Sequence, residues 1–468
     1  MTLLVISPDY ASHALPLVTL AGAWRDSGER VVVATGPAMA PLVAASGMEL
    51  TQLVLGRGSN AGVARPEDQP HGEDDNLRAF FEATRRGMIA TLRYQAEARA
   101  RDLLWEPEAV ARRTLDVVED VRPDSVLVDH LAFGATIGLR AAGIPYADVV
   151  PGHPRQLPVA GETYGVPGAW PAAFLPDPHE LADLRSYAGE VADRFTDAYN
   201  NALRRVAPGV EPVPDAFAAH GSTVLFNYPA ALHDPRRTAA LPERHAFLGA
   251  TVRRDPEAPE VQRWLDRADE RPIVLVSLGT FLSARADVLA IIAAGLRRLD
   301  VRVALATGSA DPRTLGPVPA AWLVAPYLPQ VRILEQARAL VTHAGNNSVT
   351  EATAKGVPML ALPFSTDQFD GAAAIETAGF GLALDPNRLT GSEVATAIER
   401  LAAKRHPALD RLARQLSARP GPEIARAAVT GPAIRGAVAA AQRLVPGSTN
   451  DDGTIPTPAR RQLQEALR

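Results

Sequence analysis

The feature that most restricts the fold of this chain is a repeated alternation of short apolar runs with helical segments. Runs such as Thr2–Ser7 and Arg30–Thr35 are rich in Val, Leu and Ile, and residues with helical spacing follow them. A Pro- and charge-rich stretch near 239–260 interrupts the alternation, which restarts at Pro272–Ser277. Buried parallel strands connected by helices have this pattern. The two series predict an α/β protein with two doubly wound parallel-sheet (Rossmann-like) domains facing across a cleft.

The interruption also sets the predicted domain boundaries. We predict an N-terminal domain over 1–240, a linker over 241–260 and a C-terminal domain over 261–446, whose last helices are able to pack back on the first domain. Residues 447–468 are predicted to form a loosely held tail. The connection 151–178 is rich in Pro and Gly and carries aromatic residues, which favours a binding surface over a bare linker.

Composition excludes several function classes. A formal charge of −5 over 468 residues offers no basic face for nucleic acid. The absence of cysteine excludes disulfides, thiolate metal sites and a Cys nucleophile, and it fits a cytoplasmic protein. The first apolar run has no basic region ahead of it, and no other run is long enough to cross a bilayer, so we predict no integral membrane association. The sequence does not indicate an oligomeric state.

An anion site is predicted at one strand–turn–helix junction of the second half. In the stretch Thr342–Gly371, polar residues fall where strands end and helices begin, the place where α/β proteins bind ligands. His343 ends a strand, and the first helical amides near Asn347 and Ser348 lack intrahelical partners. Such a helix start attracts an anion, and a diphosphate is the natural guest. Thr280, in the turn after another strand, is placed to add a hydroxyl.

Further polar and aromatic residues extend this site. Glu351, one helical turn on, suits ribose hydroxyls, and Asp367 with Gln368 offers acceptors and donors for a second polyol. Tyr327 is suited to stack on a flat base. A base, a ribose, a diphosphate and a sugar in this order predict a nucleotide-activated sugar as ligand.

Residues 327–368, YLPQVRILEQARALVTHAGNNSVTEATAKGVPMLALPFSTDQ, resemble the donor-binding signature of the UDP-glycosyltransferase-like family, glycosyltransferase family 1. That family has the GT-B fold and includes bacterial natural-product glycosyltransferases. The resemblance implies that His343 and Ser348 bind the diphosphate beside Asn347. It also places Glu351 at the ribose. The implied donor site consists of Thr280, Tyr327, Gln330, His343, Gly345, Asn347, Ser348, Glu351, Asp367 and Gln368.

Within that signature the chain departs from the usual pattern at three positions. Tyr327 and Asn346 stand where Trp is commoner, and Gly371 stands where Asn is often found. By resemblance, Asp367 and Gln368 face the transferred sugar and Tyr327 faces the base.

Glycosyl transfer to a hydroxyl requires a base, and histidine oriented by a carboxylate is the usual choice. His13 lies between the first strand and the first helix, and Asp129 ends a later parallel strand, so both are able to open on one edge of the sheet. The resemblance implies that His13 is the base and Asp129 its partner, with inversion at the anomeric carbon. The alternatives are that His13 satisfies a backbone carbonyl and that Asp129 caps a helix.

We therefore predict an inverting, hexosyltransferase-type enzyme that moves a sugar from a UDP- or dTDP-sugar to a hydroxyl, less often an amine, of a small, largely apolar natural product. The donor would bind to the C-terminal domain and the acceptor to the N-terminal one. Neither Asp-x-Asp nor His-x-x-x-His occurs, so we predict no metal, and no cofactor beyond the co-substrate. Two alternatives stay open. An epimerase or hydrolase would need extra acid/base groups near Asp367, and a non-catalytic nucleotide-sugar-binding helper would have a broken His–Asp pair.

Overall fold

Two all-parallel sheets form the framework of the protein. The computed structural model describes residues 1–61, 73–279, 285–403 and 406–430. Two doubly wound α/β domains were predicted, and this fold class is confirmed. Thr280 and the predicted tail lie outside the described residues.

The first sheet has seven strands in the order β3-β2-β1-β4-β5-β6-β7, and every neighbouring pair is parallel. Because sequential strands run outward from β1 in both directions, the order reverses between β1 and β4, and such switch points are where α/β proteins bind ligands. The strands are β1 (Thr2–Ile6), β2 (Arg30–Thr35), β3 (Glu49–Gln52), β4 (Ser125–Asp129), β5 (Ala147–Val150), β6 (Thr223–Phe226) and β7 (His245–Phe247).

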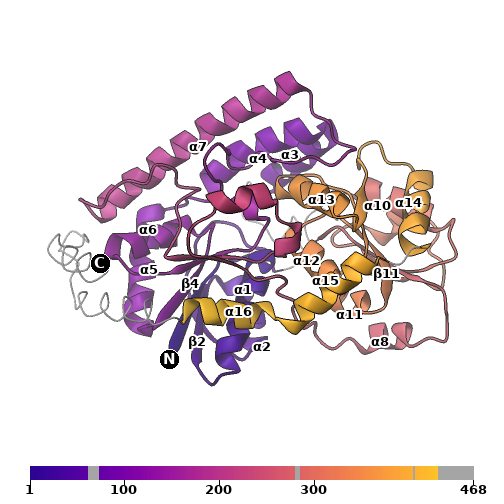
Figure 1. The fold of residues 1–468 in the computed structure, drawn as a ribbon, viewed down its shortest axis with the longest axis horizontal. Helices are drawn as coiled ribbons and strands as arrows, with labels where there is room; N and C mark the ends of the chain where they lie inside the picture. The colour runs from indigo at the N-terminus through magenta and orange to yellow at the C-terminus, as the bar shows by residue number, and fades with distance from the viewer. Residues whose placement is uncertain (62–72, 280–284, 404–405, 431–468) are drawn as a thin grey trace.

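Helices cover both faces of this sheet (Figure 1). The helices between β1 and β6 are α1 (Ala11–Arg25), α2 (Ala40–Ala45), α3 (Glu73–Arg86), α4 (Met88–Asp102), α5 (Pro107–Val121), α6 (Phe133–Ala142) and α7 (Pro178–Val206). Three helices, α3, α4 and α5, lie between residue 73 and Val121, and the break between α3 and α4 is at Gly87, whose φ of 113° an L side chain rarely adopts.

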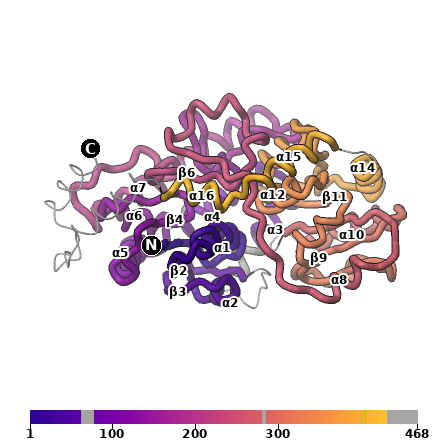
Figure 2. Tube along the Cα trace, turned by 60° about the horizontal axis from the view of Figure 1, so that its bottom comes forward, coloured from indigo at the N-terminus to yellow at the C-terminus, as the bar shows by residue number. Residues whose placement is uncertain are grey.

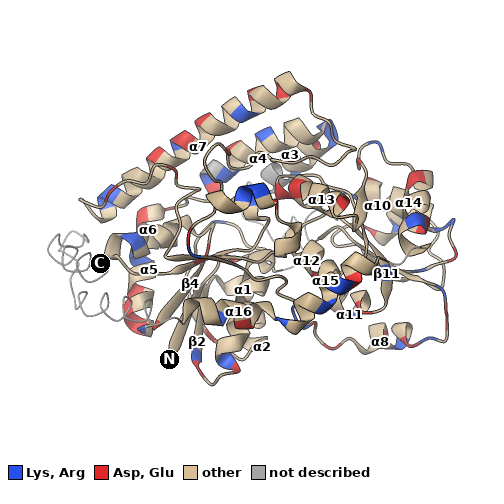
Figure 3. Cartoon of the chain, viewed as in Figure 1, with Lys and Arg blue, Asp and Glu red and all other residues tan. Residues whose placement is uncertain are grey.

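The long helix α7 shows why these segments are helical. Asp177 caps it by accepting hydrogen bonds from the amides of His179 and Glu180, at 2.9 and 3.2 Å. Its buried side chains recur every three or four residues, from Leu184 to Val206, and pack on the core of the first domain. Acidic and basic residues are distributed along the rest of this helix (Figure 3).

The second sheet has six parallel strands in the order β10-β9-β8-β11-β12-β13. Its strands are β8 (Ile273–Ser277), β9 (Arg302–Ala306), β10 (Leu323–Ala325), β11 (Ala337–Thr342), β12 (Met359–Ala361) and β13 (Gly381–Ala383). Its helices are α8 (Pro259–Leu265), α10 (Ala286–Leu296), α11 (Gln330–Leu334), α12 (Asn346–Ala354), α13 (Asp367–Thr377), α14 (Gly391–Ala403) and α15 (Pro407–Ala418).

The chain crosses between the domains twice. Strand β7 of the first sheet lies inside 241–260, the segment predicted as a linker, so the first sheet continues further along the chain than the sequence indicated. The last described helix, α16 (Gly421–Val429), returns to the first domain, where Ala425 and Val429 pack in one apolar cluster with residues of α1 (Figure 1; Figure 2). No helix within the described ranges has the length and apolarity needed to cross a membrane.

Candidate functional site

His13 and Asp129 meet at the carboxyl edge of the first sheet. Because β1 and β4 are parallel neighbours, the first turn of α1, after β1, lies beside the end of β4. His13 Nδ1 is 2.8 Å from Asp129 Oδ2, and the other carboxylate oxygen accepts from the amide of Leu131 at 2.9 Å. The Asp129 side chain is fully buried, whereas that of His13 is 24% exposed. The sequence prediction that these residues pair is therefore met by the geometry, while their catalytic role stays a prediction.

The contact with Asp129 changes the pKa of the His13 imidazole. Burial opposes the charged form of His13, but the attraction and hydrogen bond of Asp129 outweigh it, and the net effect raises the pKa of His13 above its ordinary value. Since Nδ1 faces Asp129, Nε2 is the nitrogen left to exchange a proton with a substrate.

The start of α12 presents unpaired amides. After β11, Ala344 adopts a positive φ of 63°, and Gly345 precedes the helix without a side-chain cap. The first intrahelical bond runs from the amide of Val349 to the carbonyl of Gly345 at 3.1 Å. The amides of residues 346–348 therefore have no partner within the helix, which is the arrangement that binds anions.

The His343 ring lies in a cradle of two glycines beside this helix start. A Cβ at Gly345 would lie 2.2 Å from Nε2, and one at Gly279 would lie 2.8 Å from Cε1. Burial lowers the pKa of His343 to about 4, so the ring is neutral near pH 7. Nδ1 is buried with no hydrogen-bond partner in the described part of the chain. Nε2, against Gly345, is thus the nitrogen placed to donate to an anion at the helix start.

Two asparagines attach this helix start to the first domain. Asn346 Nδ2 donates to the carbonyls of Pro151 and Asn227, at 2.6 and 2.8 Å. Asn347 Nδ2 donates to the carbonyl of Ser12 at 3.0 Å.

The carbonyl of Ser12 is available because of a proline. In a regular helix the amide of residue 16 would bond to it, but Pro16 has no N–H. The side chain of Asn347, predicted to face a diphosphate, is therefore engaged with the residue before His13, and only its backbone amide faces outward. The bridging role of Asn346 was missed, because no sequence pattern indicates which carbonyl an amide will reach across a domain interface.

The nucleoside end of the predicted donor site is assembled around Glu351. Gln330 Nε2 donates to Glu351 Oε2 at 2.7 Å and to Ser348 Oγ at 3.2 Å. Arg253, which sequence reasoning missed, pairs through Nη1 with Glu351 Oε1 at 3.2 Å. Tyr327 is 48% exposed, as a ring that stacks on a base would be.

The two residues predicted to hold the transferred sugar differ in how they are placed. Asp367 Oδ2 accepts from the amide of His153 at 3.1 Å and from Gln156 Nε2 at 3.3 Å, across the domain interface. Gln368, in contrast, turns inward. Its Oε1 accepts from two amides of the loop before α13 and its Nε2 donates to Ser365 Oγ, so its amide stabilises that loop and does not face the interface.

Asp367 lines an interdomain pocket. From the first domain the pocket is lined by Arg99, Gln156 and Tyr164, and from the second by Thr366 and Asp367 among others. The region 151–178, predicted as a binding surface, supplies part of this wall. Among the described residues no cluster of three or more His, Asp or Glu side chains could hold a metal ion.

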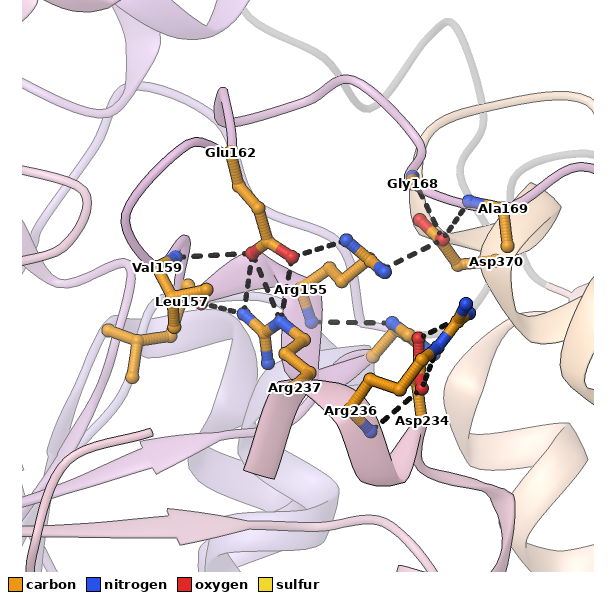
Figure 4. Close-up of polar contacts among 11 residues, drawn as sticks. Arg155, Leu157, Val159, Glu162, Gly168, Ala169, Asp234, Arg236, Arg237 and Asp370 are labelled. Carbon is orange, nitrogen blue, oxygen red and sulfur yellow. Dashed lines mark hydrogen bonds and ion pairs between the residues drawn. The ribbon is translucent and has the colours of Figure 1, made fainter. Parts of the chain in front are cut away.

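A charged network ties the wall of this pocket to α13 (Figure 4). Asp370 Oδ1 accepts from the amides of Gly168 and Ala169, at 3.0 and 2.9 Å, and lies 3.3 Å from Arg155 Nε. Arg155 also pairs with Glu162, which Arg237 holds from its other side. Burial raises the pKa of Asp370 to about 7, against the opposing charge of Arg155.

We predict that Arg155→Ala lowers the free energy of unfolding by about 2 kcal/mol at pH 8, because it leaves Asp370 buried without its cation. The cost is below that of breaking a fully buried pair, because the Arg155 side chain is 19% exposed. The pKa of Asp370 is raised in the folded state, so its contribution to stability falls as pH rises toward 7, and removal of Arg155 should cost less at pH 6. Denaturant unfolding at both pH values measures this.

A matched control lies in the same network. Arg236 is 90% exposed and pairs with Asp234 at the surface, so Arg236→Ala should leave stability unchanged. Equal stability losses for the two variants would contradict the structural role given to Arg155.

Two facing parallel sheets, with a His–Asp pair on one and an uncapped helix start on the other, define a protein of the GT-B class. Residues 215–413 match the family model of UDP-glucoronosyl and UDP-glucosyl transferases. The matched residues include the motif over 327–368, whose resemblance to the donor-binding signature of this family was noted from the sequence.

Proteins named as glycosyltransferases also match parts of the chain. The chain is 31% identical over 286 residues to the PGL/p-HBAD biosynthesis glycosyltransferase of Mycobacterium tuberculosis, covering 61% of this chain and 64% of that protein. It is 34% identical over 254 residues to the anthocyanidin 3-O-glucosyltransferase of Hordeum vulgare, covering 50% and 52%. The matches thus span less than two thirds of these relatives' own lengths.

Among solved structures, spinosyn rhamnosyltransferase SpnG superposes with a TM-score of 0.63 at 20% identity, over 91% of this chain and 99% of that one. This similarity shows the fold. SpnG has also been solved with thymidine diphosphate and with spinosyn aglycone.

Proposed function

We propose that the protein is a glycosyltransferase that moves a sugar from a nucleoside diphosphate sugar to a hydroxyl of a small natural-product acceptor. One observation carries the proposal. The hydrogen bond from Asn347 to the Ser12 carbonyl holds the uncapped start of α12 next to the residue that precedes His13. An anion site and a base are thereby joined across the domain interface, as transfer from a diphosphate to a hydroxyl requires.

The geometry supports an inverting displacement. His13 Nε2 takes the hydroxyl proton while the acceptor oxygen forms a bond to the anomeric carbon, and Asp129 stabilises the imidazolium through Nδ1. The bond from that carbon to the diphosphate oxygen breaks on the opposite side. Free amides of α12 and the neutral ring of His343 stabilise the charge on the departing diphosphate.

The substrates are proposed by analogy with the relatives. SpnG binds thymidine diphosphate and an aglycone, and the family model is named for UDP donors, so UDP- and dTDP-sugars are the proposed donors. The intact His13–Asp129 contact favours an enzyme over a non-catalytic nucleotide-sugar-binding helper. No observation favours the epimerase or hydrolase alternative.

A nucleotide screen followed by a transfer assay tests the proposal. UDP or dTDP at a hundred times its dissociation constant should raise the stability of the folded state by about 2.7 kcal/mol, which appears as a higher unfolding temperature, whereas GDP should have a smaller effect. The nucleotide that binds then identifies which activated sugars to supply with a panel of polyketide and phenolic acceptors. Absence of any shift with all three nucleotides would rule out the proposed donor class.

A further inference from the structure

An arginine of the interdomain connection reaches the nucleoside end of the donor site. Arg253 lies between β7 and α8, in the segment predicted only as a linker, and its Nη1 is 3.2 Å from Glu351 Oε1. The two side chains are 16% and 3% exposed, so both charges are largely removed from water. Buried charges are costly unless they are paired, which makes this contact a defined part of the site.

Glu351 is held from two sides at once. Gln330 donates to Oε2 at 2.7 Å, while Arg253 pairs with Oε1. Arg253 is itself fixed by Asp255, whose Oδ1 is 3.2 Å from Nε and whose Oδ2 accepts from the amide of Arg332 at 3.0 Å. This chain of contacts leaves the carboxylate a single orientation.

The cation also opposes protonation of that carboxylate. Burial raises the pKa of Glu351, and the charge of Arg253 is the largest influence that opposes the rise. A protonated acid in the same place would accept hydrogen bonds poorly. Tyr327 lies close enough to Arg253 for that charge to counter the rise that burial causes in the pKa of Tyr327, so the proposed base and ribose positions share one cation.

We propose that Arg253 is a positioning residue for the donor, an inference that rests on the proposed function. It holds the Glu351 carboxylate in the orientation in which it accepts hydrogen bonds from the ribose hydroxyls of a nucleoside diphosphate. Because Arg253 belongs to the connection between the two sheets, ribose binding is coupled to the conformation of that connection.

The test compares nucleotides with and without ribose hydroxyls. Isothermal titration gives dissociation constants for UDP and 2′,3′-dideoxy-UDP, or for dTDP and its 3′-deoxy analogue if dTDP binds more tightly. The wild type should prefer the hydroxylated form by about tenfold or more. Arg253→Gln should reduce the preference to below about threefold, and Glu351→Gln should do the same. Arg253→Lys should restore part of the preference.

The adjacent Arg254 supplies a matched control, because it is exposed and outside the site, and Arg254→Gln should keep the wild-type preference. If Arg253→Gln keeps the wild-type preference for nucleotides with ribose hydroxyls, the inference is overturned. Tighter nucleotide binding by Arg253→Gln would overturn it too, because it would mean that Arg253 blocks the ribose position. If Arg253→Gln does not fold, Arg253→Met takes its place, because it also removes the cation, and a wild-type preference in Arg253→Met overturns the inference equally. Absence of nucleotide binding to the wild type would instead overturn the proposed function itself.

Discussion

His13→Ala is expected to lower the rate of sugar transfer by about 10²- to 10⁴-fold, the range that general-base catalysis contributes, while nucleotide binding stays within twofold of the wild type. The physical reason is that His13 contacts Asp129 on the first domain, whereas the predicted diphosphate site is built from α12. Initial-rate assays with an identified donor and acceptor measure the first effect and titration calorimetry measures the second. His179→Ala, at an exposed position of α7, is the control and should keep full activity.

The Asp129→Asn variant should have a pH–activity profile that is shifted in a defined direction. Asp129 raises the pKa of His13, and the base works in its neutral form, so wild-type activity should fall as pH drops below that raised value. Without the carboxylate the pKa of His13 falls, and the acid limb of the profile should move to lower pH together with a loss of rate. An acid limb that stays in place would mean that another group is the base.

Gly345→Ala is expected to weaken binding of UDP or dTDP by about 10- to 100-fold, equivalent to losing one or two hydrogen bonds to a charged group. The backbone at Gly345, with φ −63° and ψ 144°, accepts an alanine without strain. The obstacle is steric: the added Cβ would lie 2.2 Å from His343 Nε2, so the ring must leave the helix start. Calorimetric titration of the folded variant measures the loss.

The control for this variant is a glycine with room around it. A Cβ added at Gly189, inside α7, would meet no neighbouring group of the described chain within 4 Å, so Gly189→Ala should hold or raise stability by about 0.5–1 kcal/mol and leave nucleotide affinity unchanged. Full nucleotide affinity in Gly345→Ala would show that the His343 ring does not contribute to the anion site.

The central strands could be predicted from sequence because strands buried on both faces are continuous apolar runs. Strands β1 and β4 were found in this way, with limits close to those observed. Three strands were missed, namely β3, β7 and β13. All three are short and lie at the edges of their sheets, where a strand is only partly covered and its sequence carries little apolar signal.

Some features of the candidate site could also be predicted from sequence, and others could not. The placement of His13 and Asp129 on one edge of the sheet could be predicted from sequence, because the carboxyl ends of neighbouring parallel strands share that edge, and their pairing was implied by the resemblance. The inward turn of Gln368 and the reach of Arg253 to Glu351 did not, because each depends on which partner tertiary packing brings within a few ångströms. The roles of these residues, the domain boundaries and the cytoplasmic location stay predictions.

The return of α16 to the first domain bears on how the chain is made. Leu17 and Trp24 of α1 share an apolar cluster with Ala425 and Val429, so the amino-terminal lobe borrows part of its interior from the far end of the described chain. During synthesis that surface stays uncovered until α16 has left the ribosome, a period in which exposed apolar side chains favour association with other chains. We therefore expect the amino-terminal lobe, produced by itself, to associate with other chains more readily than the full chain does.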